Sequence, residues 1–587
     1  MKQILKIMSA ACVLPLCMLF LSCEDLLNIL FEEVNGQSYD VVTATKSVSW
    51  DYSSSSDAYR ADDSVLNINV SGSIGGKTLY LVKANPNDYS ISLNDTRIVK
   101  STASGFRAAS EEKTVTDASD LISIPASSGK RHFAPPPVEL PETAARNASA
   151  DFFSGSSTVS KISRTVGTTK NIYVDYDTEI SEFTQKTATL QAVGTYCNVW
   201  IVNDYYSIGS SSGNRVNKSV AQSFASKFDD MYKIITNIYG DESDKLIDAD
   251  SSTRSTIYTK NMDDYSDTGT YVNIVIYDIG NDYSKRESEQ CCVLGYFYAK
   301  DYYYSTKSSS DIIGKSNKGK YFYIDSAYAV NDLDDTISTL AHEFQHMINF
   351  NQKNIKHNLA PDTNYNEMLS MLCEDMMQSH LGVADKNSPK SRFQTFNSYY
   401  YLSGIREYRD GNYVSASYAN AYAFGAWLAR NYGGAALIKE ISTNSYIDNE
   451  SIVRAVRTVS GNNYTFDDLF AQFLTALLDN SSAYTMKKDA AQTVSYDGYT
   501  YPMTSINLLS SAYSPESEYM SENRKYAGNG YQSKGPFVFS NNYGTSLRSE
   551  YGISIHEIKT YSSGTTRDTI SLSSSGAEGL VNYFIIK

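Results

Sequence analysis

The middle of the chain combines one long amphipathic stretch with several short apolar runs. Between residues 214 and 239, apolar side chains return every three or four positions, from Val216 through Phe224 to Ile238. This is the period of a helix with one buried face. Runs rich in Val, Ile, Tyr and Phe flank it, and their length and composition are typical of buried strands. The predicted strands cover residues 171–176, 196–203, 271–277, 293–299 and 320–324.

A second amphipathic stretch covers residues 336–350. Ile337, Leu340, Phe344 and Ile348 form one apolar face of this predicted helix. Further helical periods follow it, at residues 418–432, 435–441, 449–459 and 465–478. Strands followed by a mainly helical half predict an α+β fold, in which helices pack on a mixed sheet.

The two ends of the chain have strand-like patterns of a different kind. Residues 37–100 alternate apolar and polar positions between turn signals, which predicts a small β-sandwich-like domain. Residues 481–587 predict a β-rich C-terminal region. Between the first of these and the central region of strands and helices, residues 101–165 are rich in Ser, Ala and Pro and are interpreted as a linker, with a cleavable pro-segment as the alternative. The predicted organisation is a leader at residues 1–22, a tether at 23–36, the small β-domain at 37–100 and the linker at 101–165. The central domain of strands and helices covers 166–480, and the β-rich C-terminal region covers 481–587.

The first 22 residues predict a signal peptide rather than part of the fold. Lys2 and Lys6 precede an apolar run that is too short to span a membrane well. Phe20-Leu21-Ser22-Cys23 is similar to a bacterial lipobox, which predicts lipidation of Cys23 and an extracytoplasmic protein anchored to a bacterial membrane, at the cell surface or in the periplasm. The alternative is ordinary signal cleavage and secretion. Cys197, Cys291, Cys292 and Cys373 are then free to pair, for example Cys197 with Cys291 or Cys292, or to remain buried thiols.

Composition narrows the choice of partners. The formal net charge is −15, which argues against nucleic-acid binding. The 48 tyrosines suit polar sheet surfaces and raise the possibility that the β-domains bind a matrix or glycan surface. The acidic run 241–250 is a candidate site for a structural Ca²⁺ ion, although it lacks the spacing of an EF-hand and a solvated turn is the alternative.

The chemistry of the chain is concentrated in His342-Glu343-Phe344-Gln345-His346, inside the predicted helix 336–350. Residues four apart lie on one face of a helix, so both imidazoles can reach one Zn²⁺ ion, and Glu343 can reach a water beside it. A surface helix with two solvated histidines is the alternative, and the apolar flanks argue against it.

A catalytic zinc site needs a third protein ligand. Glu367 and Glu374 follow on a second predicted helix, which a reversal after residue 350 would bring antiparallel to the first. They are seven residues apart and therefore lie on one face. One can bind the metal while the other accepts a hydrogen bond from an imidazole N–H.

These residues carry a family resemblance. H-E-x-x-H followed by Asn366-Glu367 resembles the gluzincins, the thermolysin-like metallopeptidases, and the longer string around it resembles the hyicolysin family of bacterial zinc peptidases. The resemblance implies a zincin domain with a mixed sheet, an active-site helix and a helical lower lobe. It implies one catalytic zinc held by His342, His346 and Glu367, with Glu343 as general base.

The match to the family pattern is incomplete at one position. The aspartate that thermolysin-like enzymes have four residues after the ligand glutamate is replaced by Met371, which leaves Glu374 or Asp375 to orient an imidazole. The resemblance also implies a tyrosine or histidine that stabilises the oxyanion. Tyr422 is the candidate, with Tyr418 one helical turn earlier as the alternative.

The resulting prediction is a zinc-dependent endopeptidase that acts on proteins or peptides. Substrate backbone is expected to add to the edge of the sheet, with residues 293–300 as the candidate edge strand. Two alternatives remain: a surface adhesin or binding lipoprotein with a non-proteolytic peptidase-like domain, and a non-peptidase zinc hydrolase on the same fold.

Overall fold

The structure is a computed structural model. It describes residues 46–61, 65–92, 99–101, 116–117, 130–131, 159–175, 183–250, 260–281, 292–306, 312–478, 493–529, 534–572 and 579–587. The predicted signal peptide, the tether, Cys23 and most of the predicted linker 101–165 lie outside these residues. The chain contains both helices and mixed sheets, so the predicted α+β class is confirmed.

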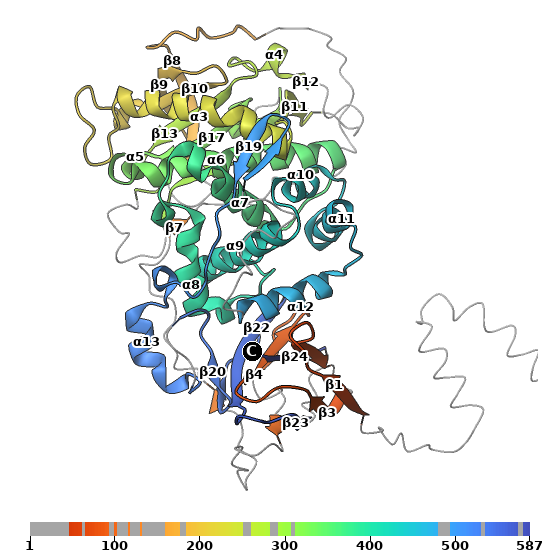
Figure 1. Ribbon diagram of the computed structural model, residues 1–587. Coiled ribbons are helices and arrows are strands. Elements are labelled where there is room, and N and C mark those ends of the chain that lie inside the picture. Colours follow the sequence, from red (N-terminus) through yellow and green to blue (C-terminus); the bar gives the residue numbers. More distant parts are fainter. Residues whose placement is uncertain are drawn as a thin grey trace, which may run out of the picture. The chain divides into compact units, whose positions relative to one another are not determined.

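A six-stranded mixed sheet forms one half of the central region of the chain (Figure 1). Its central strands β10, β13 and β17 are parallel and buried along their whole length, which explains why they read as continuous apolar runs. Strand β15 closes one edge, antiparallel to β17. In sheet order the strands are β15 (Gly295–Phe297), β17 (Lys320–Asp325), β13 (Val272–Tyr277), β10 (Cys197–Val202), β9 (Phe183–Val193) and β8 (Thr169–Asp175).

Two helices cover one face of this sheet. Helix α3 (Lys218–Tyr239) packs on β9 and β10, and helix α6 (Leu333–Asn349) packs on β15 and β17. The two helices meet at Phe228 and Phe344, whose rings are 4.9 Å apart in an edge-to-face contact. Helix α6 is thereby fixed between the sheet and α3, close to the sheet edge formed by β15.

Helix α7 (Thr363–Leu381) lies beside α6 and is capped at both ends. The Asp362 side chain accepts a hydrogen bond from the Tyr365 N–H at the start, and Gly382 ends the helix with φ 75°. Helix α9 (Val414–Asn431) packs against α7 on its other side. A Cβ atom at Gly425 would lie 2.6 Å from Cγ of Met368, so glycine permits this close approach.

The remaining helices complete a mainly helical half. Short segments connect α6 to α7, including the π-helix η8 (Phe350–Ile355), and α5 (Ser326–Asn331) precedes α6. The other long helices are α8 (Arg392–Tyr399), α10 (Ala435–Thr443), α11 (Asp448–Ser460) and α12 (Phe466–Leu477). The shorter ones are α4 (Met262–Tyr265) and α13 (Ser517–Asn523).

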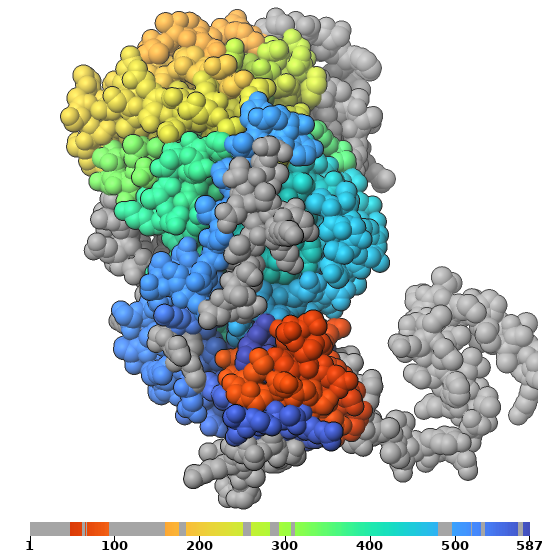
Figure 2. Space-filling model, in the orientation of Figure 1, coloured from red at the N-terminus to blue at the C-terminus, as the bar shows by residue number. Residues whose placement is uncertain are grey.

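The two predicted β-regions at the ends of the chain share the same sheets. Strand β4 (Thr78–Asn85) lies between β22 (Gly552–Thr560) and β24 (Val581–Ile586), and β3 (Val65–Ser71) pairs with β23 (Arg567–Leu572). The sheet orders are β1-β3-β23-β5 and β2-β24-β4-β22-β20. A shared apolar core lies between them, and Figure 2 shows the red N-terminal and violet C-terminal surfaces adjoining.

The other strands of these and the smaller sheets are short. They are β1 (Lys46–Asp51), β2 (Ala58–Ala61), β5 (Val99–Ser101), β6 (Thr116–Asp117), β7 (Lys130–Arg131), β11 (Lys245–Asp248), β12 (Lys260–Asn261), β14 (Cys292–Val293), β16 (Tyr303–Tyr304), β18 (Thr493–Tyr496), β19 (Tyr499–Pro502), β20 (Phe539–Ser540) and β21 (Tyr543–Gly544). None of the helices among the described residues has the length and apolar character needed to cross a membrane.

Candidate metal centre

Helix α6 presents His342 and His346 on one face, one turn apart. Both are buried, and their rings lie 4.8 Å apart. The opposite side of α6 is held in the core by Leu340, Phe344 and Ile348. The position of the two imidazoles is therefore determined by the packing of a rigid helix.

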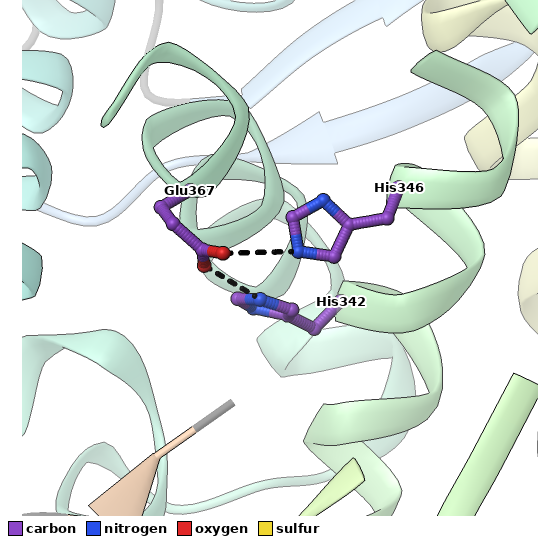
Figure 3. Close-up of side chains that lie close together, drawn as sticks. All are labelled: His342, His346 and Glu367. Atoms are coloured by element: carbon purple, nitrogen blue, oxygen red, sulfur yellow. Dashed lines mark hydrogen bonds and ion pairs between the residues drawn. The ribbon is translucent and has the colours of Figure 1, made fainter. Parts of the chain in front are cut away.

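Helix α7 brings Glu367 opposite the two histidines, as the sequence predicts. Its Oε2 lies 3.1 Å from Nε2 of His342, and its Oε1 lies 3.4 Å from Nε2 of His346 (Figure 3). One ligand atom of each residue lies within 4.8 Å of the others, and among the described residues these three are the only such group of metal-binding side chains.

The three side chains fit a divalent metal ion. Tetrahedral zinc with bonds of about 2.0–2.2 Å holds its ligand atoms about 3.3–3.5 Å apart, which is close to the two distances from Glu367. Nε2 of His346 and Oε1 of Glu367 are buried, and neither atom has a hydrogen-bond partner. A buried polar atom without a partner costs free energy that coordination would recover.

A second set of side chains orients the imidazoles. Glu374 Oε1 lies 2.7 Å from Nδ1 of His342, and the Ser338 hydroxyl donates to its other oxygen at 2.6 Å. Ser370 Oγ lies 3.1 Å from Nδ1 of His346. Glu374 therefore accepts from the Nδ1–H of His342, which leaves Nε2 of that ring directed toward Glu367. Glu374, rather than Asp375, is the carboxylate placed beside an imidazole.

The carboxylates also determine the protonation of the histidines and of Glu367. Burial lowers the pKa of His342, but the hydrogen bonds with Glu367 and Glu374 outweigh it and raise the pKa to about 10. Burial raises the pKa of Glu367, but the two histidines lower it to about 2. For His346, burial dominates and lowers the pKa. Glu367 is therefore an anion at neutral pH, as a metal ligand must be.

Glu343 lies on the same helix and is fully buried. Burial raises its pKa well above the usual range; His342 opposes this effect, and the Glu367 and Glu374 carboxylates reinforce it. A hydrogen bond with the backbone of Phe297 in β15 acts in the other direction. Glu343 is thus a carboxyl group with an increased proton affinity, between the metal ligands and the edge strand.

The structure distinguishes between the two tyrosines considered from the sequence. Burial, and then the Asp375 carboxylate, raise the pKa of Tyr422. The centre of its ring lies 5.2 Å from the centre of the Phe393 ring. Burial and then Glu367 raise the pKa of Tyr418, and Glu343 adds to this. The charges of Glu367 and Glu343 thus act on Tyr418, the alternative from the sequence, whereas Asp375 acts on Tyr422, one turn further along α9.

A cleft of about 300 Å³ adjoins the metal centre. Glu374, Leu294 at the sheet edge and Arg392 on α8 line it, together with the charged residues Asp335, Lys386 and Glu516. The Arg392 guanidinium lies 4.6 Å from the centre of the Tyr418 ring. Sequence reasoning missed Arg392, because nothing in the pattern of α8 distinguishes it from a solvated arginine.

The predicted edge strand lies at the edge of the sheet, and most carboxylates of the acidic run 241–250 lie in ion pairs. Residues 295–297 form β15, the last strand of the six-stranded sheet. Four carboxylates of the run 241–250 are paired with lysines, and the fifth, Asp250, accepts hydrogen bonds from Ser305 and Thr306. The pairs are Asp241–Lys356, Glu242–Lys320, Asp244–Lys320 and Asp248–Lys260. Cys197 and Cys373 are buried free thiols, so the suggested bridge from Cys197 is absent.

Comparison with known proteins gives two findings. A family model described as Peptidase M30 matches residues 177–517. The neutral metalloprotease ShpI of Staphylococcus hyicus is 26% identical to the chain over 303 residues. That alignment covers 49% of this chain and 58% of the relative. The residues matched by the family model include all of α6 and α7, and therefore the whole candidate metal centre.

Proposed function

The chain belongs to the peptidase M30 family, and we propose on that premise that it is a zinc-dependent endopeptidase that hydrolyses peptide bonds in proteins. The observation that carries the proposal is the convergence of His342, His346 and Glu367 at ligand distances, with Glu343 buried on the same helix. Two imidazoles and one carboxylate that leave a coordination position open are the ligand set of catalytic rather than structural zinc.

The side chains have complementary roles in this proposal. A zinc ion bound by the three ligands supplies Lewis acidity, which polarises a substrate carbonyl and increases the acidity of water. Glu343 takes the proton from the attacking water and delivers it to the leaving amine. Its raised pKa suits both steps, because a general base that must later act as an acid works best near the pH of the reaction.

Tyr418 is the proposed donor to the oxyanion of the tetrahedral intermediate. Its hydroxyl is buried, and the raised pKa keeps it protonated at neutral pH, so that it can donate a hydrogen bond. Glu374 holds His342 in the tautomer that presents Nε2 to the metal. This assignment replaces Tyr422 by Tyr418 and retains every other site residue considered from the sequence.

Metal content and hydrolysis test the proposal together. Purified protein is expected to contain about one zinc per chain and to cleave casein, with both lost on chelation and restored by zinc. Glu343→Gln is expected to retain the metal and to lose at least about 10²–10⁴-fold in kcat. Glu450→Gln on the surface of α11 is the matched control and should behave as wild type. Full activity of Glu343→Gln, or a protein that binds no metal, would refute the proposal.

We also propose that lipidation of Cys23 anchors the enzyme to a bacterial membrane outside the cytoplasm. The support is the sequence Phe20-Leu21-Ser22-Cys23 after the apolar run. Metabolic labelling with a palmitate analogue should modify the wild type and not Cys23→Ala. Equal labelling of both would contradict it.

A further inference from the structure

The cleft beside the metal centre contains a cation that the proposed mechanism does not use. Arg392 is half-buried, and its guanidinium lies 4.6 Å from the centre of the Tyr418 ring. Its helix, α8, packs on α9, which carries Tyr418 (Figure 1). No carboxylate of the residues that the structure describes forms an ion pair with Arg392. A permanent cation that is partly withdrawn from water and has no anion beside it favours an anionic ligand.

The carboxylates that line the same cleft are already stabilised by the chain. Glu374 is bound to His342 through one oxygen and to a serine hydroxyl through the other. Glu516 accepts a hydrogen bond from the Tyr399 hydroxyl at 3.2 Å. Asp335 lies in the first turn of α6, where the helix dipole favours a negative charge. The anions of the cleft are thus engaged, and its arginine is left to bind a carboxylate from outside.

The size and lining of the cleft suit one polar side chain. Its volume of about 300 Å³ is at the lower end of the range of ligand pockets, which is about 300–1,000 Å³. Among the described residues, Leu294 and Pro389 are the only apolar side chains that line it. The hydroxyls of Thr395 and Ser415 and the exposed Lys386 add hydrogen-bond donors. This lining favours a small anionic group over an apolar side chain.

The cleft lies within reach of the residues next to a bond that is cleaved at the metal. Glu374, which lines it, is hydrogen-bonded to His342. Burial and then the charge of Glu367 raise the pKa of Tyr418, and Arg392 opposes them, so this tyrosine is close to a metal ligand and to Arg392. Consecutive Cα atoms are about 3.8 Å apart. The side chain of a residue directly beside the cleaved bond can therefore extend to the guanidinium.

We propose that Arg392 binds the carboxylate of an aspartate or glutamate side chain directly beside the cleaved bond, and that the enzyme therefore selects acidic sequences. The inference rests on the proposed endopeptidase function and names its substrate class. A guanidinium can hold a carboxylate through two parallel hydrogen bonds, which an amide of the same shape cannot reproduce. Because Arg392 is only half-buried, water weakens the pair, and we expect a preference of about tenfold over the amide.

A cleavage profile tests this selectivity. Zinc-loaded wild type, Arg392→Met, Arg392→Lys and the surface control Arg454→Met each digest a proteome-derived peptide library, and mass spectrometry identifies the new chain ends. In wild type and in the control, Asp and Glu should be enriched about tenfold over Asn and Gln at one position flanking the cleaved bond. Arg392→Met should lose this enrichment, and Arg392→Lys should retain part of it.

The enrichment is a ratio within one digest, so a general loss of activity through altered packing of Tyr418 does not change it. Absence of acidic enrichment in wild type, or equal enrichment in Arg392→Met, would overturn the inference. Cleavage confined to bonds beside a free chain end would assign the arginine to a terminal carboxylate instead, and would equally overturn it.

A binding measurement separates this inference from the proposed activity. Fluorescent nonapeptides with a central Glu or Gln between two runs of four alanines, both amidated, are titrated into zinc-loaded Glu343→Gln protein, and anisotropy reports binding. The Glu peptide should bind about tenfold more tightly, and the difference should vanish in Glu343→Gln/Arg392→Met.

A Gln peptide with a free terminal carboxylate should bind like its amidated form. If it binds as tightly as the Glu peptide, the cleft recognises a chain end and the inference fails. If no variant hydrolyses peptides but the difference between Glu and Gln depends on Arg392, only the proposed function fails. Equal binding of the two amidated peptides to Glu343→Gln protein would refute the role of Arg392.

Discussion

Two clusters of buried charge lie at different positions around helix α7, and they are neutralised in different ways. In one, Asp375 forms a two-pronged ion pair with Arg430, at 2.8 and 3.1 Å, and both side chains are buried. In the other, Glu367 and Glu374 face the imidazoles of His342 and His346. Arginine is a permanent cation, whereas imidazole is neutral or charged depending on its surroundings. In the first cluster, which we call the closed cluster, the chain itself neutralises the buried carboxylate. The second, which we call the open cluster, can still bind a divalent cation.

The difference between the two clusters shows that burial of charged side chains alone does not identify a functional site. Both clusters are inaccessible to solvent, and both raise the pKa of a nearby tyrosine. Each cluster has buried atoms without hydrogen-bond partners, but the Asp375 oxygen is ion-paired with the permanent cation Arg430 at 2.8 Å, whereas on the α6 side the atoms are a nitrogen of His346 and an oxygen of Glu367, both suited to bind a metal ion. We therefore expect substitutions in the closed cluster to change stability, and substitutions in the open one to change metal binding and catalysis.

The largest effect is expected from removing the arginine of the closed cluster. Arg430→Met leaves Asp375 buried without its cation, so the free energy of unfolding should fall by about 3–5 kcal/mol. Urea denaturation of the zinc-loaded protein measures it. Arg454→Met removes an exposed pair with Glu450 and serves as the control, with an expected loss too small to resolve in the same titration. A loss from Arg430→Met as small as this would remove the distinction between the two clusters.

The two tyrosines on α9 provide the next test. Tyr418→Phe removes the proposed oxyanion donor, and kcat should fall about 10²–10³-fold, equivalent to about 2.7–4 kcal/mol. Tyr422→Phe, one turn away beside Asp375, should leave kcat within a factor of about two, because its hydroxyl belongs to the closed cluster. Steady-state kinetics of both variants decide the matter, and the reverse pattern would exchange the two roles.

A smaller effect is expected from the carboxylate that orients His342. Glu374→Gln keeps the shape of the side chain and removes its charge, so zinc affinity should fall about 10–100-fold, or about 1.4–2.7 kcal/mol. Competition with a chromogenic chelator measures the affinity. Glu516→Gln changes another carboxylate of the same cleft and should leave zinc affinity unaltered. Equal affinities in all three proteins would exclude a role for Glu374 in the metal centre.

The smallest effect is expected on the free energy of unfolding, from a buried lysine that belongs to neither cluster. Lys83 in β4 is buried, has no carboxylate partner among the residues that the structure describes, and its pKa is lowered by burial to about 8. Above pH 8 the unfolded chain binds more protons at this position than the folded chain, so stability should rise with pH. The expected gain is about 1 kcal/mol between pH 8 and 9.

Lys83→Met provides the comparison for this pH dependence. Its free energy of unfolding should lack the rise between pH 8 and 9 that wild type shows in urea titrations at the two pH values. If the free energy of unfolding changed equally with pH in wild type and Lys83→Met, burial would not lower the pKa of Lys83.

The close approach of His342, His346 and Glu367, which could hold a metal ion, could be predicted from the sequence because it depends largely on local geometry. His346 is four positions after His342, and Glu374 is seven positions after Glu367, so periodicity alone places each pair on one face. The choice between Tyr418 and Tyr422 could not be made in this way. Both lie on a helix that is buried over most of its surface, and the side that faces the metal centre depends on how α9 packs against α7.

The strand pairings were the least predictable part of the fold. Strand β9 was missed because the sequence Thr184-Gln185-Lys186-Thr187 is polar, although β9 pairs with two neighbours. The pairing of β7 with β14 joins residues far apart in the chain, and two residues carry no periodicity that would indicate it. Periodicity identifies strands, but it does not identify their partners when these are distant in sequence.

Strand β4 has a consequence for the order of events during synthesis. Its two neighbours, β22 and β24, are near the other end of the chain, and Asn69 in β3 bonds to Thr569, 500 residues later. At about 5–20 residues per second, a ribosome needs about 25–100 s to produce that second strand. During this time the apolar faces of β3 and β4 have no sheet partners, so protecting them from aggregation is a kinetic requirement of making this protein.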